Sequence, residues 1–389
     1  MGRRRRRARG QRSRLLSPRR GERRRRVRER SPRQAALGRE PPRRGGRVHG
    51  SCSRLAPVGA DQRPGVRAAT LAADASTGAR IGVVIGRVCI VGAGTIGSLF
   101  AGHLAQVVDV CVLTRRREHA QALDEHGLRV TGRSELTARL EATADPSALP
   151  DFDLGIVCCK GTDLETVAAS LEGRAAQATL MTVQNGLGAE DVVRRHGDWP
   201  LISAITFMSG TRHSDTEVEY ILDAATWLGP YEETPLARVR EVEALIRSSG
   251  LRAQAFEDLR PLQWSKLVFN ATVNGVAALT GLPHDFHFAS EAEPTDLGRL
   301  VHALMEEGTA VAQAAGPGTA DDPWEMNVHA TGRGSGHYPS MLEDVNAERP
   351  TEVESINGAL VREAERLGVE IPLQRSLYAL VRAREASYS

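Results

Sequence analysis

A short apolar stretch followed at once by regularly spaced glycines constrains this chain more than any other feature. Residues 87–91 have the character of a buried strand, residues 98–105 have helical periodicity, and residues 107–113 form a second apolar run. In such a βαβ unit the glycines permit a tight turn, close approach of a pyrophosphate to the helix N-terminus, and close helix–strand packing. We therefore predict a dinucleotide-binding loop made of Gly92, Ala93, Gly94, Thr95, Ile96 and Gly97.

The end of the second predicted strand indicates which dinucleotide binds. A site for NAD usually places Asp or Glu there, where the carboxylate binds the ribose 2′-hydroxyl. This chain instead has Thr114 and three arginines, Arg115 to Arg117, and the first acid is Glu118. Guanidinium groups suit a 2′-phosphate. We expect NADPH/NADP as the cofactor, with Arg115 as its contact because it lies nearest the strand end.

The first 82 residues differ in composition from the rest of the 389-residue chain. Residues 1–50 contain 21 Arg and 3 Glu, and the first aromatic residue is Phe100. Because such a segment buries too little apolar surface to fold, we expect a disordered Arg-rich extension, with translation starting near Val83 or Val84 as the preferred explanation. An arm that binds nucleic acid is the other interpretation, and the missing aromatic side chains, which would stack on bases, count against it.

The apolar runs are too short for a membrane protein. None approaches the roughly 18–20 residues that cross a bilayer, and no signal-peptide core follows the basic N-terminus. We expect a soluble, cytoplasmic protein without a membrane partner.

The cysteines and histidines do not form a metal-binding pattern. Four cysteines lie in apolar runs, as buried reduced thiols do, and the adjacent pair has no CxxC spacing. These cysteines are Cys89, Cys111, Cys158 and Cys159. The spacing of four histidines does not match a set of metal ligands either; these are His103, His284, His287 and His337. We predict no metal site.

The order of predicted elements gives the fold class. Further strands are expected at residues 153–159 and 179–183, and a strand-rich hairpin at 204–228. Helical periodicity covers 262–279, 297–315, 340–344, 351–367 and 373–385. We predict an α/β protein, with a Rossmann NADP-binding domain over residues 83–256 and an all-helical domain for substrate binding and catalysis over 257–389. The exposed helices of the second domain are compatible with a homodimer.

Lysine is so rare here that its positions are informative. Of 51 basic residues only Lys160 and Lys266 are lysines, and a lysine, unlike an arginine, can give up a proton. Lys266, Asn270 and Asn274 are spaced i, i+4, i+8 along one face of an otherwise apolar helix. An amine flanked by two amides suits the binding and reduction of a carbonyl compound. The alternative is the solvated edge of an amphipathic helix.

Four further polar residues lie at predicted strand ends or helix starts. Lys160 follows a predicted strand at the edge where ligands bind in open α/β sheets, and Asn185 follows the next strand in a glycine-rich turn. Asn185 is equally compatible with a plain loop. Ser340 and Thr351 each stand where a helix begins, and N-capping explains both.

Taken together, residues 87–389 resemble the ketopantoate reductase family. The motifs occur in the family's order, and the ordered set is specific although each motif alone is modest. They are Gly92-x-Gly-x-x-Gly97, Lys160, Asn185-Gly-x-Gly188, Lys266-x-x-x-Asn270-x-x-x-Asn274, Ser340-Met-Leu-x-Asp344, Thr351-Glu352 and Ile356-Asn357-Gly358. The resemblance implies NADPH-dependent reduction of 2-dehydropantoate to pantoate, in pantothenate biosynthesis. It also implies a helical domain like that of the 6-phosphogluconate dehydrogenase group.

The same resemblance assigns roles to individual residues. It makes Lys266 the proton donor to the substrate carbonyl, and Asn270 and Asn274 the ligands of substrate hydroxyl and carboxylate groups. Further substrate contacts are implied for Asn185, His284 and Ser340. Cofactor contacts are implied for Lys160, Asn185, Gly210 and Glu352.

Two other functions stay open at this point. Two places depart from the family's pattern: the stretch just before Ser340, and His284 itself at a substrate-lining position. A reductase of a different 2-oxo acid or of a bulky carbonyl compound is therefore the first alternative. A non-catalytic NADP-binding sensor is the second, and it would not need Lys266.

Overall fold

The structure, a computed structural model, describes residues 85–289, 295–332 and 338–388. The predicted extension over residues 1–82 and the position of His337 lie outside these ranges. No helix in the described ranges has the length and apolar character that crossing a membrane requires.

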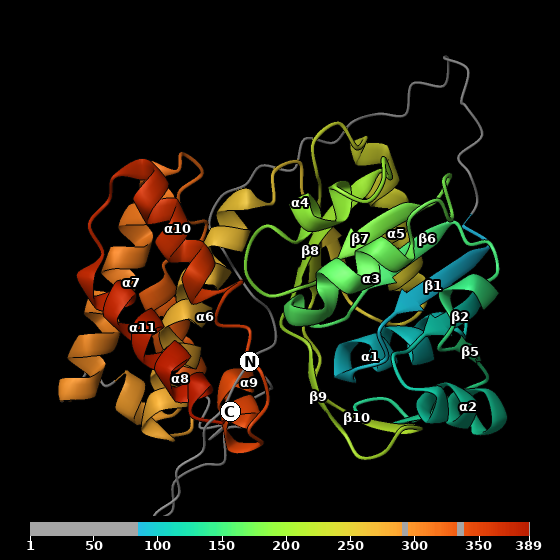
Figure 1. The fold of residues 1–389 in the computed structure, drawn as a ribbon, viewed down its shortest axis with the longest axis horizontal. Helices are drawn as coiled ribbons and strands as arrows, with labels where there is room; N and C mark the ends of the chain where they lie inside the picture. Colours follow the sequence, from blue (N-terminus) through green and yellow to red (C-terminus); the bar gives the residue numbers. More distant parts are fainter. Residues whose placement is uncertain (1–84, 290–294, 333–337, 389) are drawn as a thin grey trace, which may run out of the picture. The chain divides into compact units, whose positions relative to one another are not determined.

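An eight-stranded sheet forms the first part of the described chain (Figure 1), in the order β12-β11-β8-β7-β6-β1-β2-β5. Every neighbouring pair is parallel except β8 and β11. The strands are β1 (Arg87–Val91), β2 (Asp109–Leu113), β5 (Glu141–Thr143), β6 (Leu154–Val157), β7 (Thr179–Thr182), β8 (Leu201–Thr206), β11 (Thr226–Pro230) and β12 (Ala253–Ala255). The carboxyl ends of β1, β2, β6, β7 and β8 therefore meet at one edge.

Alternate side chains of β1 enter different cores, as a two-residue period requires. Val88 and Ile90 pack with side chains of α1 and α5, whereas Cys89 and Val91 pack with side chains of α3 and α4. These helices are α1 (Thr95–Leu104), α3 (Leu164–Ser170), α4 (Ala189–Arg194) and α5 (Leu236–Ser248). Burial of both faces explains why the strand reads as a continuous apolar run.

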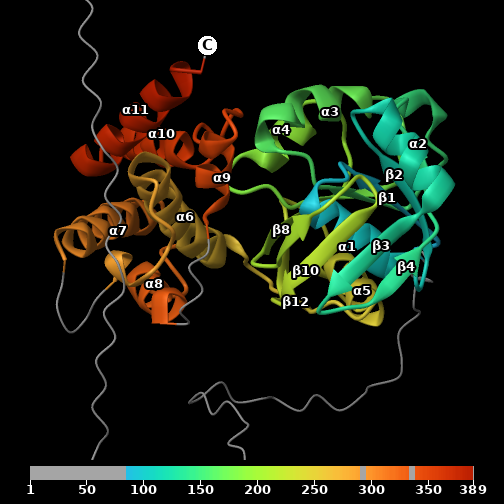
Figure 2. The same cartoon turned by 90° about the horizontal axis from the view of Figure 1, so that it is seen from below.

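A second sheet of four strands packs on α1 (Figure 2), in the order β4-β3-β10-β9. Its strands are β3 (Leu128–Gly132), β4 (Leu136–Ala138), β9 (Ser209–Arg212) and β10 (Glu217–Leu222), and α2 (Arg117–His126) precedes β3. The strand-rich hairpin region predicted for residues 204–228 is confirmed by the antiparallel β9–β10 pair, although its strands are divided between two sheets. The segment contributes β8 and β11 to the large sheet and β9 and β10 to the small one, because β10 pairs with the distant β3.

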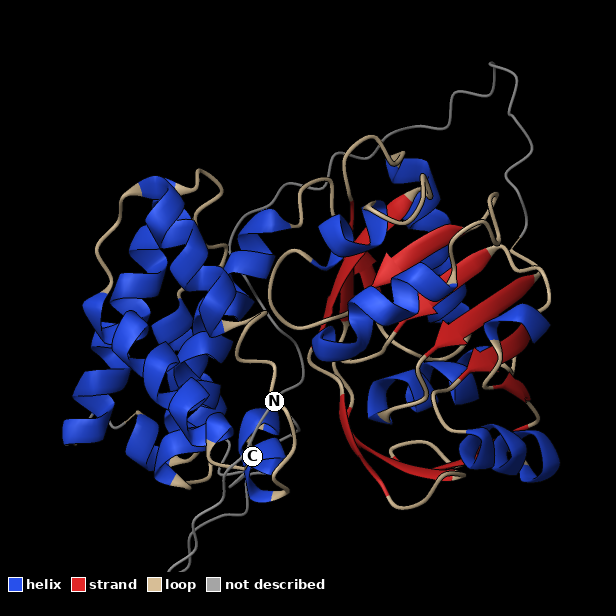
Figure 3. Cartoon of the chain, in the orientation of Figure 1, coloured by secondary structure: helices blue, strands red, loops and turns tan. Residues whose placement is uncertain are grey.

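All strands of the described residues precede Arg260, and helices follow (Figure 3). The helix α6 is buried along most of its length among α7, α8, α9, α10 and α11. Their bounds are α6 (Arg260–Thr280), α7 (Asp296–Ala314), α8 (Pro323–Gly332), α9 (Ser340–Asn346), α10 (Asn357–Leu367) and α11 (Pro372–Ala386). A mostly parallel sheet followed by a helical part confirms the predicted fold class. The division at residues 256 and 257 stays a prediction.

Two predicted elements begin too early. Val107 and Val108 belong to the turn after α1, where their backbone N–H groups donate to Leu104, and β2 begins at Asp109. The helix predicted from Thr351 begins at Asn357. Thr351 is buried and its Oγ1 accepts from the backbone N–H of Val353 at 3.2 Å, which closes a turn in place of a helix cap.

Candidate functional site

The glycine loop between β1 and α1 has the geometry that a dinucleotide requires. Gly92 has φ +104°, and a Cβ atom on it would lie 2.7 Å from the backbone nitrogen of Cys159. A Cβ on Gly97 would lie 1.9 Å from the carbonyl oxygen of Gly92, so helix and strand are in close contact there. Gly94, by contrast, is exposed and faces open space.

The first turn of α1 is suited to a pyrophosphate. Its N-cap is Gly94, no side chain caps it, and no acid lies in that turn. The first backbone N–H groups of a helix lack partners within the helix and carry partial positive charge. Gly210 of β9 lies beside this turn, because a Cβ on it would come within 3.2 Å of the Thr95 methyl carbon. The residues present therefore fit the diphosphate of a nicotinamide dinucleotide.

Arg115 is an exposed cation at the end of β2. Its side chain is 80 % exposed and pairs with Asp163 at 3.3 Å, a surface ion pair of small energy. Arg116 forms an ion pair with Asp215 in the β9–β10 turn, whereas Arg117 is exposed in the first turn of α2. The guanidinium groups of Arg115 and Arg117 are therefore both open to an anionic ligand, and the 2′-phosphate contact of Arg115 stays a prediction.

Glu352 joins the segments that follow β6 and β7. Its Oε1 accepts from the backbone N–H of Gly161 at 3.1 Å, and its Oε2 accepts from Asn185 Nδ2 at 3.1 Å. Lys160, next to Gly161, donates from Nζ to Asp344 Oδ1 at 2.5 Å. The structure thus brings together Lys160, Asn185 and Glu352, which the sequence analysis assigned to the cofactor. Their contact with a cofactor stays a prediction.

Gln184 is a positioning residue that sequence reasoning missed. It is buried, and its Nε2 donates to two carbonyls at the end of β6, those of Val157 at 2.9 Å and Cys159 at 3.0 Å. This one side chain ties the turn carrying Asn185 to the strand end carrying Lys160. The sequence shows Gln184 only as a polar residue in a turn, because its partners are backbone atoms brought near by strand pairing.

Lys266 is the buried amine of the site. Its side chain lies on α6, and its Nζ donates to the carbonyl oxygen of Thr206, the last residue of β8, at 2.6 Å. The Nζ lies 5.1 Å from the centroid of the Phe207 ring. Burial lowers the pKa of Lys266 from its ordinary 10.5 to about 8, while the negative charge of Glu352 acts in the opposite direction. An amine with such a pKa can deliver a proton near neutral pH.

Two amides continue the face of α6 that carries Lys266. Asn270 is half-buried and Asn274 is buried, and within the described ranges neither side-chain amide has a hydrogen-bond partner. Their donors and acceptors are therefore available to a ligand. Ser340 is the first residue of α9, it is exposed, and its hydroxyl caps nothing, since Pro339 occupies the N-cap. The helix-cap explanation of Ser340 is therefore wrong, and its role toward substrate stays a prediction.

His284 has structural partners. It is buried, its Nε2 lies 2.7 Å from Asn327 Oδ1, and its ring packs edge-on against Phe269 and Phe288. Asn327 in turn donates to the carbonyl of Phe288 at 3.1 Å. These contacts hold the 284–288 segment against α8. The substrate contact predicted for His284 stays a prediction.

The thiols resemble strand core more than a reactive site. Cys89 and Cys111 are buried on neighbouring strands, and Cys158 and Cys159 are half-buried; all four are free. Burial raises the pKa of the Cys159 thiol to about 12, which keeps it protonated. Within the described ranges no three His, Cys, Asp or Glu side chains gather to hold a metal ion.

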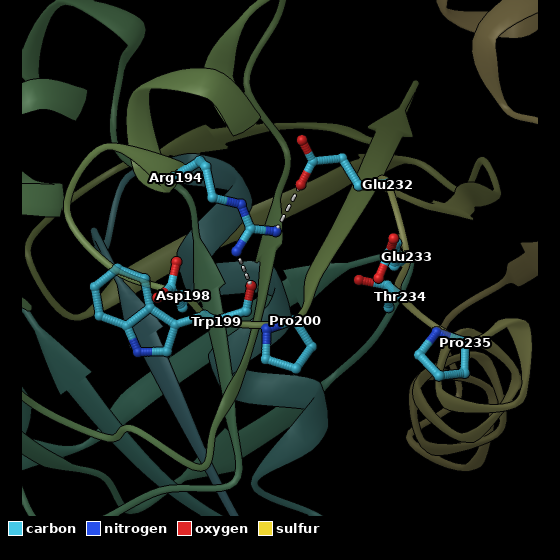
Figure 4. Close-up of a pocket in the computed structure, with 8 residues that line it drawn as sticks. All are labelled: Arg194, Asp198, Trp199, Pro200, Glu232, Glu233, Thr234 and Pro235. Atoms are coloured by element: carbon cyan, nitrogen blue, oxygen red, sulfur yellow. Dashed lines mark hydrogen bonds and ion pairs between the residues drawn. The ribbon is translucent and has the colours of Figure 1, made fainter.

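A pocket of about 420 Å³ lies where β8 begins and β11 ends (Figure 4), at the end of β8 opposite to the Lys266 carbonyl contact. Arg194 crosses it, donating to the carbonyl of Trp199 at 3.0 Å and pairing with Glu232 at 3.0 Å. The other lining residues are Asp198, Pro200, Glu233, Thr234 and Pro235. None of the predicted site residues lines this pocket.

Comparison with known proteins gives one family for both parts of the chain. Residues 88–233 match the family described as "Ketopantoate reductase PanE/ApbA", and residues 258–385 match "Ketopantoate reductase PanE/ApbA C terminal". The 2-dehydropantoate 2-reductase of Halobacterium salinarum is 31% identical over 302 residues, which cover 76% of this chain and 98% of that protein.

Solved structures share the fold. The crystal structure of 2-dehydropantoate 2-reductase from Methylococcus capsulatus matches with a TM-score of 0.68 and 28% identity, over 78% of this chain and 98% of that one. The ternary structure of D-mandelate dehydrogenase with NADH and anilino(oxo)acetate matches with a TM-score of 0.71 and 24% identity, over 78% of this chain and 99% of that one.

Proposed function

Because this chain belongs to the ketopantoate reductase family of oxidoreductases, we propose that it reduces 2-dehydropantoate to pantoate with NADPH. The observation that carries the proposal is the buried Lys266 amine, fixed on the Thr206 carbonyl at the head of a row of unpartnered amides on α6. The bound cofactor supplies the hydride that reduces the carbonyl carbon. The residues of this chain supply binding, orientation and the proton.

Lys266 acts on the carbonyl oxygen. As the carbonyl carbon is reduced, negative charge develops on the oxygen, and a positive amine already in place stabilises that charge without rearrangement. The proton then passes from Nζ to the oxygen, which yields the hydroxyl group. With its pKa near 8, the amine is mainly protonated at pH 7 and can be recharged from solvent between turnovers.

The other site residues orient the reactants. Asn270 and Asn274 bind the substrate hydroxyl and carboxylate, and Ser340 adds a contact to the carboxylate. The glycine loop and the first turn of α1 hold the pyrophosphate, and Arg115 binds the 2′-phosphate that distinguishes NADPH from NADH. Glu352 fixes the strand-end segments that carry Lys160 and Asn185 next to the cofactor.

A related 2-oxo acid is the second candidate substrate. The observation that favours it is Phe207, a half-buried aromatic ring beside the proton donor. D-mandelate dehydrogenase, which shares the fold, was solved with the aryl compound anilino(oxo)acetate and with NADH. A change of substrate would keep the same proton donor.

The test is turnover by the full chain, followed by the loss of NADPH absorbance, with 2-dehydropantoate, other 2-oxo acids and NADH in place of NADPH. We expect NADPH-preferring reduction of 2-dehydropantoate, and a loss of about 10²–10⁴-fold in kcat for Lys266→Met. Lys160→Met, which removes the other amine, is the matched comparison; because Lys160 is a predicted cofactor contact, we expect it to raise KM for NADPH while keeping most of kcat. Tight NADPH binding with no turnover of any 2-oxo acid would support the sensor instead.

A further inference from the structure

Three aromatic rings form a ladder across β8, β11 and β12 of the large sheet. The Phe207 and Trp227 ring centroids are 5.7 Å apart at 74°, and those of Trp227 and Phe256 are 6.2 Å apart at 73°. Phe256 follows β12, Trp227 lies in β11 and Phe207 follows β8, so the ladder crosses the sheet in strand order. All three side chains are half-buried, which leaves part of the ladder open.

The ladder ends at the proton donor. The Phe207 ring centroid lies 5.1 Å from Lys266 Nζ, and the carbonyl that binds this Nζ belongs to Thr206, the preceding residue. Thr206 is buried, and its Oγ1 accepts from the backbone N–H of Met208 at 3.1 Å, which closes the turn around Phe207. One short turn therefore fixes both the Phe207 ring and the Thr206 carbonyl that binds the Lys266 amine.

This arrangement constrains what can be attached to the reacting carbonyl. A carbonyl oxygen that receives the proton must lie within about 3 Å of Lys266 Nζ. The ring lies close enough to that position for the carbon chain of the substrate to pack on it. A carboxylate packed on the ring face would lose water without gaining a partner from the ladder, whereas methyl or aryl carbon would cover apolar surface.

We propose that Phe207, supported by Trp227, determines substrate specificity by forming an apolar wall for the group on the third carbon of a 2-oxo acid. The wall selects 2-oxo acids with a branched or aryl third carbon, a class that includes 2-dehydropantoate with its two methyl groups. This inference rests on the proposed function, because it takes Lys266 as the group that meets the carbonyl oxygen.

The test compares kcat/KM of the wild type, Phe207→Leu and Phe207→Ala for pyruvate, oxaloacetate, 2-oxo-3-methylbutanoate, 2-dehydropantoate and phenylglyoxylate. We expect the wild type to favour the branched and aryl acids over pyruvate and oxaloacetate. Phe207→Ala should lower kcat/KM for the branched and aryl acids by about 10–100-fold and for pyruvate by less than about threefold. Phe207→Leu should recover the branched acids more than the aryl acid.

Trp324→Leu is the matched control. Trp324 is also a half-buried aromatic residue, but its ring contact is with His302 on α7, and we expect no change in the order of substrates. If Phe207→Ala lowered kcat/KM equally for every acid, the ring would act only through Lys266, and the proposed apolar wall would be wrong. Unchanged kinetics in Phe207→Ala would overturn it as well.

A binding measurement separates this inference from the proposed function. Calorimetry on the NADP⁺-loaded protein should show phenylglyoxylate and 2-oxo-3-methylbutanoate binding at least about tenfold more tightly than pyruvate, with the difference lost in Phe207→Ala. If this binding preference is found but no acid is turned over, the proposed catalytic function is wrong and the proposed specificity role of Phe207 is supported. If turnover occurs and the binding preference is absent, the wall fails and the catalytic proposal stands.

Discussion

The amine of Lys266 combines two properties that are costly to combine, burial and positive charge. Burial lowers its pKa to about 8, and the opposing effect of Glu352 keeps the shift from being larger. A proton donor must carry its proton, so its activity depends on which side of that pKa the solution lies.

We therefore predict that kcat/KM falls as pH rises through about 8, because the amine loses the proton that it must deliver. Glu352→Gln removes a nearby negative charge, so the pKa of Lys266 should fall further and the loss of activity should begin at lower pH. Asp344→Asn, which alters the partner of Lys160 instead, is the comparison. A pH profile with no decline between pH 7 and 9 in the wild type would contradict the role of Lys266.

At the scale of elements, the turn between β7 and α4 depends on Gln184. Gln184→Met keeps the length of the side chain and removes both of its N–H donors, which leaves the Cys159 carbonyl without its Gln184 partner and the Val157 carbonyl with only the backbone N–H of Val183. We expect a loss of about 1–3 kcal/mol in the free energy of unfolding. We also expect a rise of about tenfold in KM for NADPH, since loosening this turn misplaces Asn185 and Gly161.

Gln106 provides a matched comparison for that prediction. Its Nε2 also donates to two backbone carbonyls, those of Gly102 at 3.1 Å and Thr137 at 3.3 Å, but it lies at the end of α1 that is far from the glycine loop. Gln106→Met should lower stability in urea without changing KM. Equal KM changes in the two variants would show that Gln184 has only a structural role.

Much of the site could be predicted from sequence because its determinants are local. The glycine loop and the spacing of Lys266, Asn270 and Asn274 are readable within a few residues, and both lysines of the chain lie on polar partners at the site. Gln184, Phe207 and the second sheet were not predicted, because their roles depend on strands far apart in the sequence. Thr351 was misread because a turn and a helix cap use the same hydroxyl-to-backbone bond.

At the scale of the whole molecule, two buried histidines couple stability to pH. Burial lowers the pKa of His103, which packs on Tyr220 and contacts the Ser249 carbonyl at 3.1 Å, and of His119 on α2. The unfolded chain therefore binds protons at a higher pH than the folded chain. The stabilisation is complete above pH 6.5 and is lost as pH falls toward the lower folded-state pKa values.

We predict that the urea midpoint of the wild type drops between pH 7.5 and pH 5, and that His103→Phe, which keeps an aromatic ring against Tyr220, makes the drop smaller. His126→Phe is the control, since His126 is exposed at the end of α2. Identical pH slopes in wild type and His103→Phe would contradict the prediction.

The acceptor that holds the Lys266 amine is a main-chain carbonyl. A substitution at position 207 changes a side chain and not this backbone oxygen, so the acceptor of the proton donor does not depend on which side chain stands at position 207. Under the proposed function, substitutions at position 207 can therefore change the preferred substrate while the proton donor keeps its acceptor.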